Sequence, residues 1–224
     1  MRVKRTGPNS QGRQGRAFCD ALEMYRKEHG GDSFFVQECG SGAAWCFFLH
    51  DNKKLTGTIV RNEKFECDVA DPQGSEQRIH KVRVKFACPA AVVEAVERQL
   101  KLDEAVAARK EGPHFLPKYR HPIEDGVLFD LMNRREVLFF TMLEGEVLRG
   151  IIRGFSKYEI RLGMKGEVPV VILRHGVYDL RDKRGRSYRQ KRQVQPTTGA
   201  KTEAAGKAGA SPAAKSPGGR SDQK

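Results

Sequence analysis

The residues best suited to bind a charged partner lie in one short segment near the C-terminus. Residues 181–192 contain seven basic residues and a single acid. Guanidinium and ammonium groups bind phosphate oxygens, and dense runs of them are typical of nucleic-acid binding. If all these cations neutralised phosphates of a single strand, log affinity would fall with log salt at a slope of roughly -5. The segment therefore predicts nucleic-acid contacts from five residues: Arg181, Lys183, Arg184, Arg186 and Arg189.

The chain as a whole is strongly basic, and the excess charge lies at its ends. The formal net charge over 224 residues is +13. Residues 1–16 hold five basic residues and no acid, while residues 17–180 hold 24 basic and 25 acidic residues. We therefore expect a nearly neutral folded body between two basic tails, residues 1–16 and 181–224. Both tails are expected to be disordered, because they contain too little apolar surface to offset the entropy of ordering. A role for the tails in solubility alone is the alternative.

No group of residues indicates catalysis. The chain has no glycine-rich phosphate loop, no nucleophile–histidine–acid set and no carboxylate pair in a catalytic context. We therefore predict a protein that is not an enzyme and uses no cofactor. The odd number of cysteines, with no C-x-x-C pair, predicts free thiols in a reducing cytoplasm. No cysteine or histidine spacing suits zinc, so no metal site is predicted and four scattered histidines receive no role: His50, His80, His114 and His121.

Membrane insertion and secretion are not expected. No apolar run approaches the roughly 20 residues that a membrane-spanning helix needs. The basic N-terminus is not followed by the apolar segment of a secretory signal.

The pattern of apolar residues predicts a mainly β protein with some helix. Residues 17–28 and 123–135 read as helices, and residues 90–110 carry the clearest apolar stripe at helical spacing. Period-two alternation and turn residues predict two sets of strands. The first set is 45–50, 55–60, 64–69 and 77–86, and the second set is 138–143, 146–154, 157–163, 168–173 and 177–180. Residues 33–36 are ambiguous and could form a short strand.

The two sets of strands resemble each other when the chain is shifted by 93 residues. Leu55-x-Gly57-x-Ile59 then falls on Leu148-x-Gly150-x-Ile152, and Lys64-Phe65-Glu66 falls on Lys157-Tyr158-Glu159. A helix precedes each set, which favours duplication over chance matching of short strands. The register is expected to fail at the next loop. The domains are then 17–88 and 123–180, with 89–122 as a helical linker and connector.

Residues 129–180 resemble the Sm-like fold, and in particular Hfq, the bacterial RNA chaperone family. The resemblance rests on Asn133-Arg134-Arg135-Glu136, the Leu148–Ile152 strand, Phe155–Tyr158, and Leu173-Arg174-His175-Gly176-Val177. It implies two small five-stranded Sm-like, or SH3-like, barrels, each preceded by a helix. It also implies a post-transcriptional regulator that binds single-stranded RNA, with uridine contacts from Lys157, Tyr158, Arg174 and His175.

The resemblance further implies a rim patch at Arg134 and Arg135 and a ring of six barrels. Two barrels per chain would give that ring from three chains, and a monomer whose barrels pair with each other is the alternative. Lys157 replaces a glutamine of the family pattern and Leu173 a tyrosine, so base preference stays open. In the first half, His80-Lys81-Val82 is only a loose counterpart of the Arg174-His175 signature.

A protein-interaction scaffold built on small β-barrels is the competing hypothesis, because SH3-like and Sm-like barrels share strand patterns and a fold does not determine a function. Duplex DNA also stays open as a partner, because phosphate contacts carry no sequence information.

Overall fold

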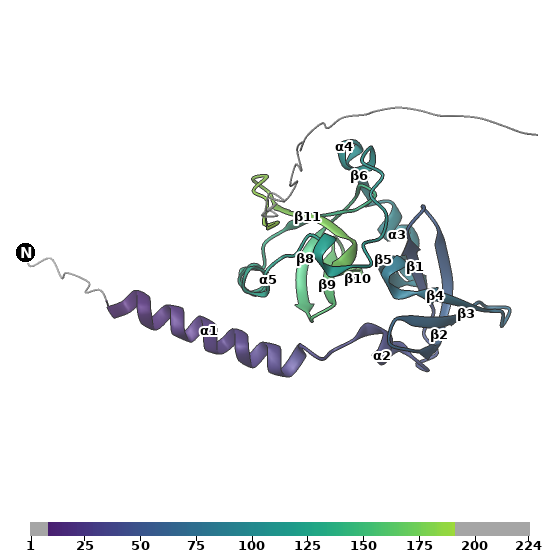
Figure 1. Ribbon diagram of the computed structural model, residues 1–224, viewed down its shortest axis with the longest axis horizontal. Coiled ribbons are helices and arrows are strands. Elements are labelled where there is room, and N and C mark those ends of the chain that lie inside the picture. The colour runs from purple at the N-terminus through teal and green to yellow at the C-terminus, as the bar shows by residue number, and fades with distance from the viewer. Residues whose placement is uncertain (1–8, 191–224) are drawn as a thin grey trace, which may run out of the picture. The chain divides into compact units, whose positions relative to one another are not determined.

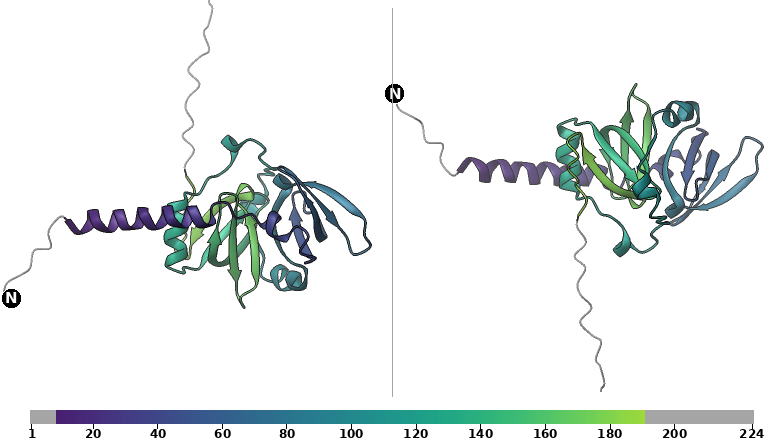
Figure 2. Two further views of the ribbon diagram at one scale, coloured as in Figure 1. Left: turned by 90° about the horizontal axis from the view of Figure 1, so that it is seen from below. Right: turned by 90° about the horizontal axis from the view of Figure 1, so that it is seen from above.

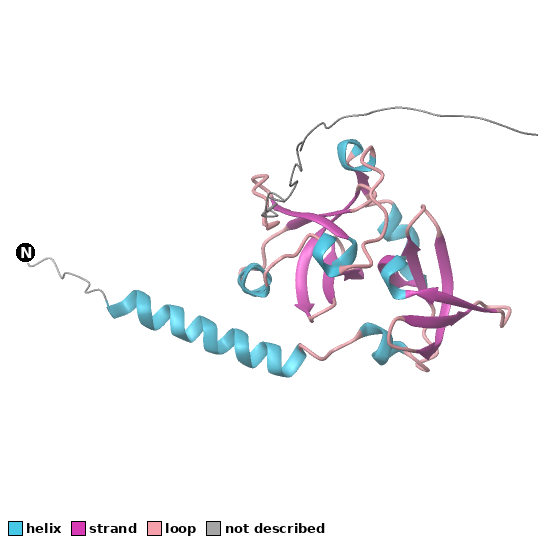
Figure 3. Cartoon of the chain, in the orientation of Figure 1, coloured by secondary structure: helices cyan, strands magenta, loops and turns pink. Residues whose placement is uncertain are grey.

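The computed structural model describes residues 9–190, which all belong to one compact unit, Met1–Arg192. Strands form most of this unit, and the helices other than the first are short (Figure 3). The strands are β1 (Trp45–Leu49), β2 (Lys54–Asn62), β3 (Glu66–Ala70), β4 (Glu76–His80), β5 (Val84–Pro89), β6 (Lys101–Leu102), β7 (Leu138–Met142), β8 (Glu146–Phe155), β9 (Glu159–Met164), β10 (Pro169–Leu173) and β11 (Val177–Asp182). The helices are α1 (Asn9–His29), α2 (Phe34–Glu38), α3 (Val93–Glu97), α4 (Glu104–Ala107) and α5 (Asp125–Asn133).

The strands form one antiparallel sheet, which overturns the predicted pair of five-stranded barrels. The order is β11-β7-β8-β9-β10-β5-β1-β2-β3-β4, with β6 added beside β8, and the two ends of the sheet are not joined (Figure 1). The reason is the pairing of β10 with β5, in which Val171 lies opposite Ala87 and Ile172 opposite Phe86. These strands use their outer edges to connect the two halves, so the halves are parts of a continuous sheet.

The predicted helical linker is also wrong. Residues 90–110 form a 3-10 turn (Ala90–Val92), the single-turn helix α3, the two-residue strand β6 and the short helix α4. β6 breaks the helix because Lys101 and Leu102 pair with Val147 and Glu146 of β8. Asp103 then starts α4 as its N-cap, accepting a hydrogen bond from the backbone N–H of Val106. The apolar residues that recur at helical spacing in 90–110 are therefore divided among these short elements and do not share one helix face.

The 93-residue repeat is more regular than the sequence comparison predicts. Strands β4 and β5, like the loop before them, recur in register as β10 and β11, so the register does not fail after the third strand. The irregularity in β2 between Ile59 and Arg61 recurs in β8 between Ile152 and Gly154. Gly150 is required in β8 because a Cβ there would lie 2.5 Å from the carbonyl oxygen of Gly163. The strands predicted in the second half are confirmed to within two residues, as is the helix before them.

The N-terminal helix is longer than predicted. Residues 9–16, expected to be disordered, begin α1, and residues 1–8 lie outside the described residues. α1 crosses α5 (Figure 2), and Phe18 and Tyr25 contact the ring of Phe129 there at centroid distances of 5.6 and 5.4 Å. Residues 33–36, read as a possible strand, instead form the start of α2, with Ser33 as its N-cap. No helix in residues 9–190 is long and apolar enough to cross a membrane.

The segment after β11 is ordered as far as it is described. Residues 181–190 were expected to belong to a disordered tail, but β11 runs to Asp182 and the chain then turns back. Ser187 forms an isolated antiparallel β-bridge with Arg181, and the Tyr188 backbone N–H donates to the carbonyl of Leu180 at 2.8 Å. The Asp182 carboxylate holds the turn by accepting hydrogen bonds from the backbone of Arg184 and Arg186. Residues 191–224 lie outside the described part of the chain.

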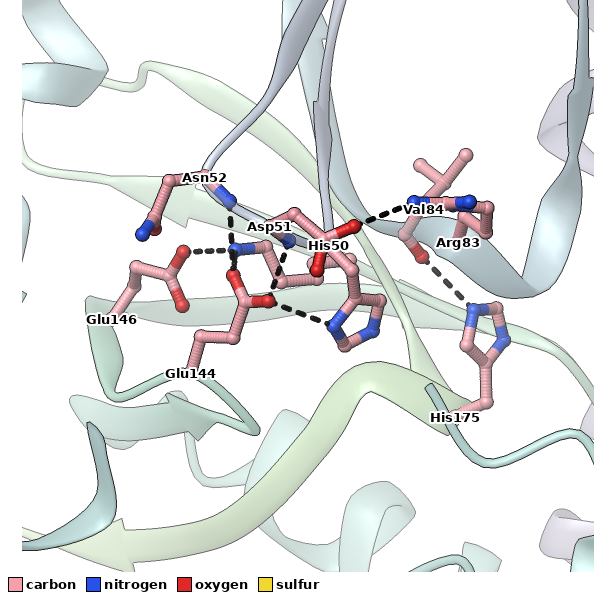
Figure 4. A network of polar contacts seen from close by, with 9 residues as sticks. His50, Asp51, Asn52, Arg83, Val84, Glu144, Glu146 and His175 are labelled. Carbon is pink, nitrogen blue, oxygen red and sulfur yellow. Dashed lines mark hydrogen bonds and ion pairs between the residues drawn. The ribbon is translucent and has the colours of Figure 1, made fainter. Parts of the chain in front are cut away.

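A buried polar network joins the halves at the junction of β5 with the β7–β8 turn, which we call the seam (Figure 4). The Lys85 side chain is 1% exposed and forms ion pairs with Glu144 and Glu146. Glu144 also bonds His50 Nδ1 at 3.2 Å and accepts from the backbone N–H of Asp51 at 2.7 Å. Apolar packing continues across the seam, because Cys46, Phe48, Phe86 and Cys88 of the first half belong to the same core as most of the second half.

Candidate nucleic-acid interface

The four residues predicted to bind uridine lie together in the structure. Lys157 and Tyr158, in the turn before β9, and Arg174 and His175, in the turn after β10, line one pocket of about 330 Å³. The other walls come from the connector between α4 and α5 (residues 108–124), from Asp125 at the start of α5, and from Ile160 and Val177. The sequence therefore identified a set of residues that meet in space, although not all of their side chains are free to bind a ligand.

Arg174 is held by the protein itself. One terminal nitrogen of its guanidinium donates to Asp125 Oδ1 at 2.8 Å and to the Ser156 carbonyl at 2.9 Å. The other donates to the Ile123 carbonyl at 2.6 Å. A guanidinium bound by a carboxylate and two carbonyls has little capacity left for a phosphate. Arg174 therefore fixes the N-terminus of α5 against the turns around β9 and β10.

His175 lies at the seam. Its Nε2 lies 2.9 Å from the carbonyl oxygen of Val84, which belongs to the first half of the sheet. Burial, together with the nearby Arg120 guanidinium, lowers the pKa of His175 to about 4, against the hydrogen bond to Val84. The imidazole is therefore neutral at pH 7 and joins the two halves, and it carries no charge for a phosphate.

The equivalent positions of the first half form part of a second, larger pocket. Lys64, Phe65, Lys81 and Val82 lie 93 residues before the four predicted residues, and all of them line a cavity of about 770 Å³. The two cavities share Arg120, Tyr158 and His175 in their walls, so they adjoin. We call the two together the aromatic groove. The 93-residue repeat is the sequence signal that points to these first-half residues.

Three exposed aromatic rings distinguish this groove. Phe65 is 59% exposed, Tyr158 is 58% exposed and Phe115, from the connector, is 57% exposed. His80 lies between two of them, with its ring stacked on Phe65 at 6.4 Å and edge-on to Phe115 at 5.3 Å. Exposed aromatic rings in a groove are surfaces on which unpaired bases stack. Nothing in the sequence pattern of the connector indicated Phe115.

Each repeat-related aromatic carries a lysine over its ring. Lys64 Nζ lies 5.1 Å from the ring centre of Phe65, and Lys157 Nζ lies 5.4 Å from that of Tyr158. Both lysines are exposed. The combination of a ring for a base and a cation for the adjacent phosphate therefore occurs twice in one groove.

Arg120 adds a third cation between the two pockets. Its guanidinium donates to the carbonyls of His114 and Phe115, and within residues 9–190 no carboxylate forms an ion pair with it. Burial lowers the pKa of Arg120. A partly buried cation without an acidic partner favours an anionic ligand. Lys81 is less available, because it donates to the Glu63 carbonyl and lies 5.1 Å from the Phe35 ring.

The remaining predicted residues lie elsewhere, around the end of α5 and the turn after β11. Arg134 forms ion pairs with Asp130 and Glu136, whereas Arg135 is exposed with φ of 50°. Arg181 bonds Asp179 at 2.7 Å, and Arg186 and Arg189 lie over the rings of Tyr188 and Tyr178. Lys183 and Arg184 are exposed in the turn. None of these residues lines either pocket of the aromatic groove.

One group in the described part of the chain has the geometry of metal ligands. Glu111, His114 and His121 bring one ligand atom each to within 4.8 Å of the others. The sequence reasoning missed it because its spacing matches no zinc pattern.

Comparisons with known proteins add no assignment. No protein family matched the sequence, and neither a curated protein nor a solved structure matched the chain.

Proposed function

We propose that this chain is a non-enzymatic RNA-binding protein that holds single-stranded RNA in the aromatic groove. The observation that carries the proposal is the pair of repeat-related units, Lys64–Phe65 and Lys157–Tyr158, exposed in one groove. Stacking of a base on an aromatic side chain contributes about 1–3 kcal/mol and tolerates any base. Two such rings, with Phe115 lining the same pocket, provide positions for several bases of one strand.

An unpaired strand suits this site better than a duplex. The rings lie in pockets, so a base has to leave its stack to reach them, which single strands allow at low cost. The basic turn after β11 and the exposed Arg135 offer further phosphate contacts away from the groove. The likeness of the second-half motifs to Hfq agrees with this partner and with a role in post-transcriptional regulation, including RNA chaperoning. A preference for U-rich sequences rests on that likeness alone.

We place the protein in the cytoplasm. The five cysteines are all free, and three of them are buried. Burial raises the pKa of both Cys67 and Cys88 to about 12, so these thiols stay protonated and unreactive. Buried free thiols of this kind are typical of proteins that fold in a reducing compartment.

The edges of the sheet favour a monomer over a ring of three chains. A ring needs β4 of one chain to pair with β11 of the next, as β10 pairs with β5 inside the chain. The outer edge of β11 is already occupied, because Tyr188 donates to Leu180, which is the repeat equivalent of Ala87 in the β10–β5 pairing. Sedimentation tests this proposal, and a stable trimer at micromolar concentration would contradict it.

Filter binding of a U-rich RNA across a range of salt concentrations tests the function. We expect binding at low salt that weakens as salt rises. A chain ending at Gln190 keeps every described residue and should retain groove binding. If the cations deleted with residues 191–224 bind phosphate, the slope of log affinity against log salt should become shallower. No measurable binding of the full chain at low salt would contradict the proposal.

A protein-docking role is the second candidate, and the apolar character of the groove favours it. Val36 and Phe65 line the larger pocket and are 62% and 59% exposed, which suits an apolar peptide as well as a base. Pull-downs with and without nuclease separate the candidates. Partners that persist after nuclease treatment and compete with RNA for the groove would favour docking.

A further inference from the structure

The geometry points to a transition-metal site in the connector, formed by Glu111, His114 and His121, with Zn²⁺ as the ion that best fits its ligands. Both imidazole groups direct Nε2 at the same carboxylate oxygen. His114 Nε2 lies 3.2 Å from Glu111 Oε2, and His121 Nε2 lies 3.3 Å from it. All three ligand atoms lie within 4.8 Å of one another.

These separations match the spacing between ligands around zinc. Zinc binds histidine nitrogen and carboxylate oxygen at about 2.0–2.2 Å in tetrahedral geometry, which places neighbouring ligand atoms about 3.3 Å apart. Two of the three separations therefore need no change. The imidazole planes of His114 and His121 are 71° apart, with ring centres at 5.9 Å, so the two rings approach from different directions.

The surroundings hold the ligands in place. Arg109 Nε donates to Glu111 Oε1 at 2.8 Å, which fixes the carboxylate and leaves Oε2 directed at the histidines. His121 is 8% exposed and packs edge-on against Tyr178 of β11, with ring centres 5.0 Å apart. Ligands oriented by such outer contacts lose less entropy when an ion binds. Arg109 also reduces the negative charge of the site, so we expect selectivity to come from the two nitrogens.

The donor set selects a class of ion. Two imidazole nitrogens and one carboxylate oxygen suit zinc and its transition-metal neighbours, whereas magnesium and calcium prefer oxygen alone. A bound ion would tie the start of the connector to its end across β11. The loop between the ligands would then be closed by the metal, which gives the site a structural role. This inference does not depend on the proposed RNA binding.

Titration of Zn²⁺ into the full chain, expressed without a histidine tag and stripped of metal, tests the site. We expect one equivalent to bind, and Co²⁺ in its place to give visible absorption bands of a low-coordinate site. Loss of an outer partner of a metal ligand costs roughly 10–100-fold in affinity. Loss of a ligand in His114→Ala or Glu111→Gln should weaken binding at least as much.

His29→Ala and Glu104→Gln, which change the same residue types outside the cluster, should bind zinc as the unchanged protein does. His114 and Glu111 are less buried than His121, and circular dichroism with thermal unfolding shows whether their variants fold. Zinc should also raise the melting temperature of the unchanged protein and not that of His114→Ala. Failure of the stripped protein to take up one equivalent of Zn²⁺ would overturn the proposal, as would unchanged affinity in folded His114→Ala and Glu111→Gln.

Discussion

The two halves of the sheet share their strand order but use equivalent positions for different purposes. In the second half, Arg174 is bound by Asp125 and two carbonyls, and His175 binds Val84 across the seam. In the first half the same positions are Lys81 and Val82. Within the described residues β4 pairs only with β3, so a histidine at position 82 would have no neighbouring strand to bind.

The difference shows that a repeated position takes its role from the contact its half makes. The seam exists once, so the residues that form it occur once: Lys85 faces Glu144 and Glu146, while its repeat equivalent is Tyr178. By contrast, each half carries one lysine–aromatic pair, and both pairs are exposed. The seam residues therefore hold the structure together, and the exposed pairs are the positions left for a ligand.

The largest expected effect comes from removing the cation of the seam. Lys85→Met leaves two carboxylates partly buried without a positive partner, and breaking a buried ion pair from one side costs about 3–5 kcal/mol. Urea unfolding should show that loss of stability, while Lys53→Met, at an exposed turn lysine, should change stability little. Adding Glu144→Gln and Glu146→Gln to Lys85→Met should recover part of the loss. A Lys85→Met protein as stable as the original would show that the seam does not hold the halves together.

Acid should act on the seam through His175. Its pKa falls to about 4 in the folded chain, mainly through burial, and lies near 6.5 in the unfolded chain. The unfolded chain therefore binds more protons between these values. The contribution of neutral His175 to the free energy of unfolding is therefore fully present above pH 6.5. It is lost as pH falls towards 4, and the loss is at most about 3 kcal/mol. Chemical unfolding at pH 7 and pH 4.5 measures the difference.

His175→Gln keeps a donor for Val84 and removes the titration, so stability should depend less on pH. His50, whose pKa burial also lowers, titrates in the same direction and leaves a residual dependence. His29→Gln, at a half-buried histidine at the end of α1 that lies away from the seam, should behave as the unchanged chain does. An equal acid sensitivity in His175→Gln would assign the effect to other groups.

Local patterns explain which parts of this fold the sequence predicts. The second-half strands follow from alternation and glycines, and Lys157, Tyr158, Arg174 and His175 follow from a motif whose residues meet across one β9–β10 pairing. The joining of β10 to β5 depends on residues about 85 positions apart, such as Val171 and Ala87, whose side chains look alike in separate barrels or one sheet. Phe115 and Arg120 enter the groove because the connector crosses it, which no local pattern indicates.

RNA affinity should test whether both halves contribute to the groove. Tyr158→Ala and Phe65→Ala each remove one stacking surface, so each should weaken binding by about 1–3 kcal/mol. Tyr119→Ala is the matched control, because Tyr119 is 47% exposed but does not line the groove. Titration of a labelled U-rich single strand gives the three affinities. A loss in Tyr158→Ala alone would confine the site to the second half.

The smallest expected effect separates the free lysines from the paired arginines. If Lys64 and Lys157 each neutralise one phosphate of a single strand, Lys64→Gln and Lys157→Gln should each make the salt slope less negative by about 0.7. Arg134→Gln should leave the slope unchanged, because Arg134 already forms ion pairs with Asp130 and Glu136. Lys27→Gln on α1 controls for the loss of one charge. A change at Arg134 equal to that at Lys64 would mean that the strand extends to the end of α5, and that phosphates displace existing ion pairs there.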